Sequence, residues 1–214
     1  MKIIITLLLM AAGVVHAACP HLYPYNKPIH IPGAVELCNE QYVALYDEHN
    51  RAVLLVSELI LAQRHNITRV SRWTTDKRVN NPVKTTEYLH TGYDRGHMAP
   101  ADSATSIVQM NESHLMTNVT PQDPTLNSGR WRALESRIQR LIEQSGTNTH
   151  VVTVAVYKDR EPANNIPVPY SYIKTAYLAS GTVAFTTLNN AVDKAQKISM
   201  TEANKMIKFA SLPK

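Results

Sequence analysis

The stretch Tyr93-Asp94-Arg95-Gly96-His97-Met98-Ala99-Pro100 places an acid, a permanent cation, a glycine and an imidazole at four consecutive positions. Arginine can hold a phosphate through two parallel hydrogen bonds. Histidine has an ordinary pKa close to neutrality, so it can act as a base without strong tuning. Glycine lets the backbone turn sharply or approach a ligand closely. The stretch therefore indicates a phosphodiester site with its own base, and we expect the rest of the chain to aim His97 at a phosphate beside a metal ion.

Length and composition favour one domain. The chain has 214 residues, of which 44% are hydrophobic and 18% are charged, and it shows no internal repeat. That length can bury one sizeable core. The formal charge of +5 suits a polyanionic partner such as nucleic acid, although an ordinary solvated basic surface would give the same charge. We expect a single domain over residues 18–214.

Residues 1–17 have the pattern of an export signal. Lys2 gives a positive start, and the apolar run of 3–15 that follows is shorter than the roughly 20 residues needed to span a bilayer. Val15-His16-Ala17 offers small residues at the two positions that matter for cleavage. No other stretch is apolar enough for a transmembrane helix. The sequence therefore predicts a secreted or periplasmic protein.

The chain has two cysteines, Cys19 and Cys38. In an exported protein two cysteines most simply form one disulfide. A lipid-modified Cys19 is the alternative, and His16, three residues earlier, fits that alternative poorly.

The pattern of apolar residues predicts an antiparallel sheet with a few helices, an α+β fold. Alternation and β-branched content indicate strands over 41–46, 52–60 and 151–157, and a hairpin formed by 170–179 and 182–188. Apolar residues at spacings of three and four predict a helix over about 130–144, ended by Gly146.

The remaining segments are expected to be less regular. The proline-punctuated residues 19–40 should run extended over the surface. Residues 63–92 form a long polar loop, and Trp73 within it either stacks on a base or anchors the loop. Thr201 is expected to cap a last helix that reaches about Phe209.

Cutting a phosphodiester needs an activated water, neutralisation of the phosphoryl oxygens and help for the leaving oxygen. His97 is the candidate for the first task, and Mg²⁺ suits the other two, because one or two protein oxygens are enough to hold it. Asn127 offers a carbonyl oxygen at the start of the predicted helix. Glu135, eight residues on, lies roughly 80° out of line with Asn127 in a helix, so both can face the same half.

Several motifs in succession resemble those of the DNA/RNA non-specific endonuclease family, whose active site is a ββα-metal motif. The resemblance runs from about residue 71 to Glu135 and continues weakly towards the C-terminus. The motifs that carry it are Asp94-Arg95-Gly96-His97, then Thr117-Asn118-Val119-Thr120-Pro121-Gln122, then Leu126-Asn127-Ser128-Gly129 with Trp131, Leu134 and Glu135.

The resemblance implies a role for each matching residue. His97 would deprotonate the attacking water, Asn127 would be the one direct protein ligand of Mg²⁺ (with Mn²⁺ as a substitute), and Glu135 would hold a metal-bound water. The substrates implied are single- and double-stranded DNA and RNA, cut to leave 5′-phosphate ends.

Three further residues receive roles from the same resemblance. Arg95 would bind a phosphate near the cut, Arg72 would stabilise the transition state, and Asn118 would line the site. His114 and Gln139 depart from the family pattern, His114 where a polar amide is expected and Gln139 near an expected arginine.

A second hypothesis stays open beside the exported nuclease. The chain could be a catalytically silent nucleic-acid-binding or surface protein on the same scaffold. The joint presence of His97, Asn127 and Glu135 favours the enzyme. The sequence leaves the oligomeric state undetermined.

Overall fold

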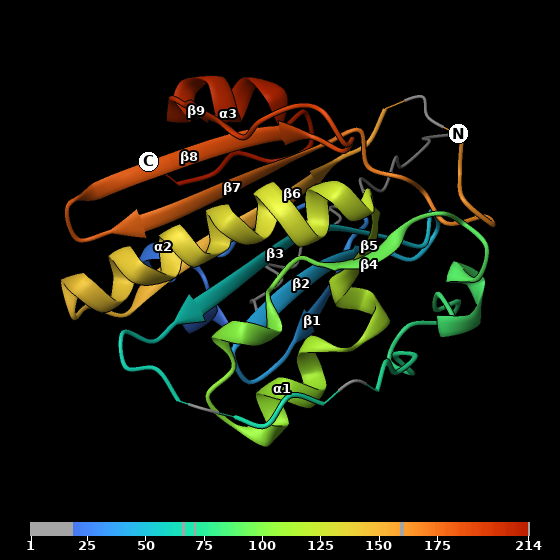
Figure 1. The fold of residues 1–214 in the computed structure, drawn as a ribbon, viewed down its shortest axis with the longest axis horizontal. Coiled ribbons are helices and arrows are strands. Elements are labelled where there is room, and N and C mark those ends of the chain that lie inside the picture. Colours follow the sequence, from blue (N-terminus) through green and yellow to red (C-terminus); the bar gives the residue numbers. More distant parts are fainter. Residues whose placement is uncertain (1–18, 66, 71, 159–160, 214) are drawn as a thin grey trace, which may run out of the picture.

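The computed structural model describes residues 19–65, 67–70, 72–158 and 161–213, so the predicted export signal lies outside the described residues. Within these ranges seven strands form one antiparallel sheet in the order β1-β2-β3-β6-β7-β8-β9 (Figure 1). Its strands are β1 (Val35–Cys38), β2 (Tyr42–Asp47), β3 (Ala52–Ile60), β6 (Thr149–Val156), β7 (Ser171–Leu178), β8 (Gly181–Leu188) and β9 (Gln196–Ile198). The α+β fold predicted from the sequence is confirmed.

The central strands are apolar on both faces because both faces of the sheet are covered. Along β6, Val151 and Ala155 belong to one buried cluster, whereas Val152 and Val154 belong to another. Successive side chains of a strand point to opposite faces, so the sheet separates two cores.

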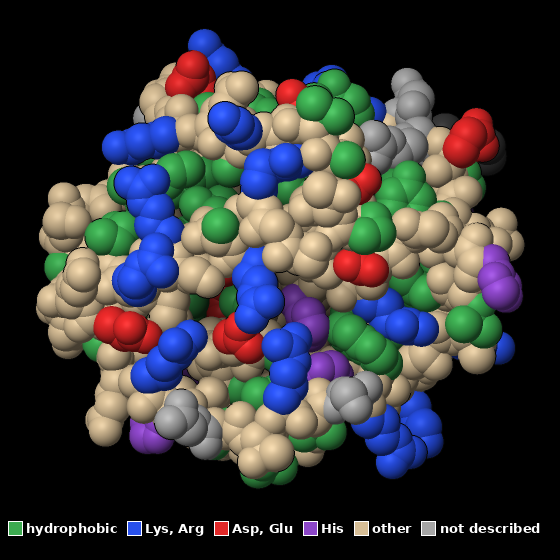
Figure 2. Space-filling view, in the orientation of Figure 1, with side chains coloured by type: hydrophobic (Ala, Val, Ile, Leu, Met, Phe, Trp, Pro, Cys, Tyr) green, Lys and Arg blue, Asp and Glu red, His purple; other side chains and the backbone are tan. Residues whose placement is uncertain are grey.

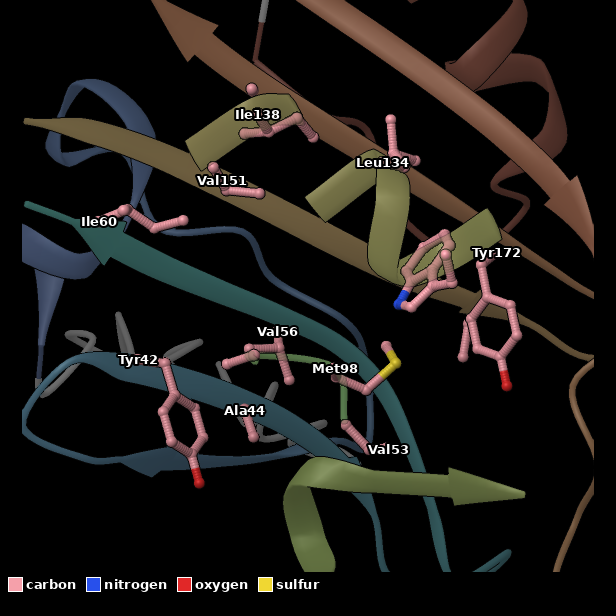
Figure 3. Close-up of a cluster of buried hydrophobic side chains, with 14 of the residues drawn as sticks. Tyr42, Ala44, Val53, Val56, Ile60, Met98, Leu134, Ile138, Val151 and Tyr172 are labelled. Carbon is pink, nitrogen blue, oxygen red and sulfur yellow. The ribbon is translucent and has the colours of Figure 1, made fainter. Parts of the chain in front are cut away.

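Helix α2 (Arg132–Ser145) covers the first face, where Leu134 and Ile138 pack towards Ile60 and Val151 (Figure 3). The prediction of a helix over about 130–144 is confirmed. Gly146 ends it in the left-handed conformation, with φ at 63°, which glycine adopts without strain.

The second face is covered by the N-terminal segment and by α3 (Met200–Met206). The expectation that residues 19–40 run over the surface is wrong for much of that segment. Leu22 and Tyr23 are buried against the sheet, and β1 forms its edge. Proline spacing predicted the irregular backbone but not which side chains the sheet would bury.

Two strands outside the main sheet carry the motif with which the sequence analysis began. β4 (Asp94–His97) pairs antiparallel with β5 (Val119–Gln122), and Gly96 lies opposite Thr120. A Cβ on Gly96 would collide with the side chain of Gln122. The glycine therefore makes room for the neighbouring strand, rather than for a turn or a ligand.

A short helix, α1 (Ile107–Ser113), lies between β4 and β5 in the chain, and a π-helical turn (Leu126–Trp131) leads from β5 into α2. The resulting β4–β5–α2 unit is the ββα arrangement that the family resemblance implied. Strands predicted over 41–46 and 52–60, and the 170–188 hairpin, are confirmed as β2, β3, β7 and β8.

The prediction for the last helix is wrong at both ends. Ser199, not Thr201, is its N-cap, because the Ser199 hydroxyl accepts from the Glu202 amide while the Glu202 carboxylate accepts from the Ser199 amide. This reciprocal capping box fixes the start two residues earlier, and the helix ends at Met206 instead of near Phe209. Among the described helices, none is long and apolar enough to cross a membrane.

Candidate active site

One cleft of about 360 Å³ brings together four of the six predicted site residues. Its walls come from β4 and residues 100–102 after it, from the π-helical turn and the start of α2, and from the loop that precedes Thr74. Figure 2 shows histidine in a hollow on this face, with basic and acidic side chains around it. The predicted residues that line the cleft are Arg95, His97, Asn127 and Glu135.

His97 is held by aromatic neighbours at the end of β4. Its ring lies 4.8 Å from that of Trp73 and 5.1 Å from that of His114. The buried Nε2 atom has no hydrogen-bond partner among the described residues. Burial, with smaller contributions from His114, Arg69 and Lys174, lowers the pKa of His97 to about 3. The imidazole is therefore neutral at physiological pH, the state in which one ring nitrogen carries a free lone pair.

Trp73 anchors the loop, as one of its two predicted roles required, by packing against both His97 and His114. It also lines the cleft, so this contact does not exclude base stacking.

Asn127 is oriented by an acid from the opposite side of the ββα unit. Its Nδ2 donates to Asp94 Oδ2 at 2.9 Å. A carboxylate only accepts, so the amide nitrogen must face Asp94 and the carbonyl oxygen remains for a cation. Asn127 lies in the π-helical turn, a distortion that is frequent at functional sites.

Glu135 forms an ion pair with a buried lysine. Lys174 Nζ lies 3.0 Å from Glu135 Oε1 and also donates to the Met98 carbonyl. Burial raises the pKa of Glu135, and the charge of Lys174 opposes that rise. Behind this pair, burial raises the pKa of Glu58 to about 7, although Lys174 and the Ser103 hydroxyl oppose the shift. Lys174 is thus a cation whose charge opposes the rise in pKa of both carboxyl groups.

Arg95 is fixed by the loop on the other side of β4. Its Nη2 donates to the Thr85 carbonyl at 2.8 Å, and its guanidinium carbon lies 5.5 Å from the Tyr88 ring centre and 5.8 Å from that of Trp73. Such cation–π contacts hold the group over a defined surface. The buried Arg95 Nε has no partner among the described residues.

Two predicted site residues do not line the cleft. Asn118 is completely buried, and its side chain donates to the carbonyls of Ala99 and Ser113 and accepts from the Ala99 amide. It therefore holds the backbone just after His97 instead of facing a ligand. Arg72 is exposed and is not one of the residues that line the cleft. Arg69, from the same loop, lines it instead.

Sequence reasoning also missed Asp94, Arg132 and Lys174. The sequence could not show that Arg69, and not Arg72, faces the cleft. Both lie in an irregular loop, where side chains follow no regular period. Lys174 did carry a signal, since it is the one charged residue of its strand and lies in the middle of it. The two residues that depart from the family pattern lie in different places. His114 is buried beside His97, whereas Gln139 hydrogen-bonds Glu143 on α2.

A ββα unit on one face of an antiparallel sheet, with a histidine, an amide and a carboxylate in one cleft, is the architecture of the ββα-metal class. The chain belongs to the DNA/RNA non-specific endonuclease family, whose family model matches residues 25–209.

Named relatives are nucleases. The chain is 30% identical over 164 residues to human mitochondrial endonuclease G. The matched stretch covers 73% of this chain and 54% of that protein. It is 28% identical over 116 residues to a nuclease of Serratia marcescens, covering 48% and 44% respectively. The chain thus spans about half the length of these curated relatives.

A solved structure of an EndoG/EndoGI complex has the same fold. It gives a TM-score of 0.71 at 21% identity and covers 80% of this chain and 83% of that chain. At this identity the likeness concerns the fold alone.

Proposed function

We propose that the chain is an exported, Mg²⁺-dependent endonuclease that hydrolyses phosphodiester bonds of DNA and RNA and leaves 5′-phosphate ends. The observation that carries the proposal is that His97, with an unpartnered Nε2, and Asn127, about thirty residues later, line the same cleft. Family membership and the nuclease relatives support the choice of substrate.

The residues present fit a hard cation. Asp94 leaves the carbonyl oxygen of Asn127 to the cleft, and the Glu135 carboxylate lines the same space. Oxygen donors in small number suit Mg²⁺, which keeps several waters, and Mn²⁺ accepts the same donors. In the described part of the chain, the one group of three or more His, Cys, Asp or Glu side chains close enough to share a metal consists of Cys19, Glu36 and Cys38, and its two cysteines form a disulfide. When bound, Mg²⁺ would neutralise charge on the phosphoryl oxygens.

The protein's own groups divide the remaining work. His97 accepts the proton of the water whose oxygen forms the new bond to phosphorus. The bond to the 3′ oxygen then breaks, and that oxygen takes a proton from solvent, which leaves the phosphate on the 5′ side. Glu135 would accept hydrogen bonds from water that hydrates a bound ion.

Arginine supplies the fixed positive charge. Arg95 binds a phosphate through the part of its guanidinium that Thr85 leaves free. Because Arg72 lies outside the cleft and Arg69 lines it, we assign to Arg69 the stabilisation of transition-state charge that the resemblance gave to Arg72. Asn118 positions the backbone that follows His97.

Export rests on the pattern of residues 1–17 and is consistent with the Cys19–Cys38 disulfide. Disulfides persist in oxidising compartments, so a secreted or periplasmic location is proposed. The disulfide also occupies the thiol that lipid modification would need.

The test is digestion of plasmid DNA and of RNA by the purified protein with Mg²⁺, with Mn²⁺ and with EDTA. The wild type should cut both polymers in either metal and neither in EDTA, and its products should accept label from polynucleotide kinase only after phosphatase treatment. Substitutions His97→Ala and Asn127→Ala should each lower kcat/KM by at least about 100-fold, with an unchanged circular dichroism spectrum.

Two results would refute the assignment. Cutting that persists in EDTA would exclude the metal. Binding of nucleic acid without any cutting by the wild type would favour the silent nucleic-acid-binding protein.

A further inference from the structure

Helix α2 borders a second groove on the flank away from the catalytic cleft. The groove holds about 330 Å³ and lies between α2 and the segment around β8 and β9. Its apolar floor contains Leu134 and Phe185. Three basic residues line it, and no acidic residue does: Arg130, Arg137 and Lys194.

The helix period separates the groove from the cleft. Leu134 and Arg137 are three residues apart and so share one face of α2, and Arg130, in the π-helical turn before the helix, lines the same groove. Arg132 and Glu135 line the cleft, and they lie about 140° and about 160°, respectively, around the axis from Arg137. The helix thus stands between the two concavities, and its buried stripe faces the sheet.

The basic side chains of the groove are available for a ligand. We find no hydrogen bond or ion pair of Arg137 or Lys194 with another described residue, and both are exposed. Arg130 donates one bond, at 3.4 Å, to the Asn190 carbonyl, while its buried Nε lacks a described partner. Figure 2 shows hydrophobic surface between α2 and β8, with Lys and Arg side chains beside it.

We propose that this groove, defined by Arg130, Arg137 and Lys194, binds the phosphodiester backbone of the nucleic acid outside the catalytic cleft. The proposal rests on the proposed function. Three cations without a lining acid match a polyanion, and the apolar floor offers contact to a sugar or a base. Arg130 and Arg137 are separated by roughly 10 Å of helix rise, a span of about three phosphates along one strand of a duplex.

The phosphates could belong to the strand being cut or to its complement, and one experiment distinguishes these sources. The double variant Arg137→Ala/Lys194→Ala is compared with Lys205→Ala/Lys208→Ala. The control removes the same charge from exposed positions at α3, on the other face of the sheet. All proteins also carry His97→Ala, so that binding is measured by fluorescence anisotropy without cutting.

The groove variant should bind a duplex of about 30 base pairs at least about five-fold more weakly than the control, and the slope of log K against log salt should fall by roughly two. Loss with duplex but not with a single strand of equal length assigns the groove to the complementary strand. Loss with both assigns it to the strand being cut. With His97 restored, hydrolysis of a dinucleotide should be unchanged, because it is too short to reach the groove.

Equal affinity and equal salt slope in the groove variant and the control would overturn the proposal. So would a changed oligomeric state in sedimentation with unaltered binding, since the groove would then contact a second copy of the chain. If the wild type neither binds nor cuts nucleic acid, the proposed function itself fails, and this outcome is distinct from the other two.

Discussion

A single hydrogen bond connects the two halves of the candidate metal site. Asp94 begins β4 and Asn127 lies in the π-helical turn before α2, and the bond between them is 2.9 Å long. Because it fixes the orientation of the amide, Asp94 prepares the ligand oxygen before an ion arrives. Pre-orientation of a ligand by a neighbouring acceptor typically changes metal affinity by about 10- to 100-fold.

The substitution Asp94→Ala should therefore raise the Mg²⁺ concentration needed for half-maximal cutting by about 10-fold or more, while activity at saturating Mg²⁺ falls less. Titration of cutting rate against free Mg²⁺ measures this. The matched control is Asp102→Ala, because Asp102 is an acid of the same cleft whose observed partner is Arg69, not Asn127. Identical Mg²⁺ curves for the two variants would remove Asp94 from the metal site.

Titration of His97 links the site to stability. Its pKa in the folded protein is about 3, whereas an ordinary histidine has a pKa of about 6.5. The unfolded chain therefore binds more protons below pH 6.5, and the stabilisation associated with neutral His97 is lost as pH falls from about 6.5 towards 3.

The free energy of unfolding of the wild type in EDTA should therefore fall more steeply over that range than the value for His97→Gln. Urea denaturation at several pH values measures both. Parallel curves would mean that burial does not hold the imidazole neutral. The cutting rate should likewise show no acid limb near pH 6.5 that belongs to this residue.

At the scale of elements, the β4–β5 pair depends on the absence of a side chain. A Cβ at Gly96 would meet the base of the Gln122 side chain, which cannot move without shifting β5. We expect Gly96→Ala to lower the free energy of unfolding by about 1–3 kcal/mol and to reduce cutting by displacing His97.

Gly129 provides the matched control for this prediction. It lies in the π-helical turn, and a Cβ there would meet nothing within 4 Å. Alanine at this position should be neutral or stabilise the protein by about 0.5–1 kcal/mol. Equal unfolding midpoints for the two alanine variants would show that β4 and β5 are not closely packed.

The elements that the sequence predicted well are those whose patterns are local. The alternation in 52–60 and the spacing of Leu134, Ile138 and Ile142 follow from burial of one element against the sheet, so β3 and α2 were found within about two residues. The last helix was misplaced because two hydroxyl residues two positions apart, Ser199 and Thr201, both suit a cap. Only the reciprocal bond to Glu202 decides between them.

The site shows the same division between local and distant information. The Asp94–His97 motif and Asn127 were found because their residue types and order are specific. The placement of Arg69 rather than Arg72, and of Asn118 beneath the site instead of in it, depends on how a loop and α1 pack. No period or propensity encodes that packing.

For the whole molecule, the disulfide joins the segment that covers one face of the sheet to the sheet's edge. Cys19 begins the described chain and is bonded to Cys38 at the end of β1, 19 positions away. Between them, Leu22, Tyr23, Ile29 and Ile31 fill the core on the face opposite the active site. A loop of this length confers about 3 kcal/mol through the entropy of the unfolded chain.

Reduction should therefore lower the melting temperature by about 6–12 °C for a domain of this size, and Cys19→Ser/Cys38→Ser should melt at the reduced wild-type temperature with or without dithiothreitol. Calorimetry with and without the reductant measures both. Because the disulfide and the catalytic cleft lie on opposite faces of the sheet, the reduced protein should keep its cutting rate well below the melting temperature. Loss of cutting at a temperature where the reduced fold is intact would show that the two cores are coupled through the sheet. The positions of β4, β5 and α2 on one face would then depend on the disulfide-bonded N-terminal segment on the other face.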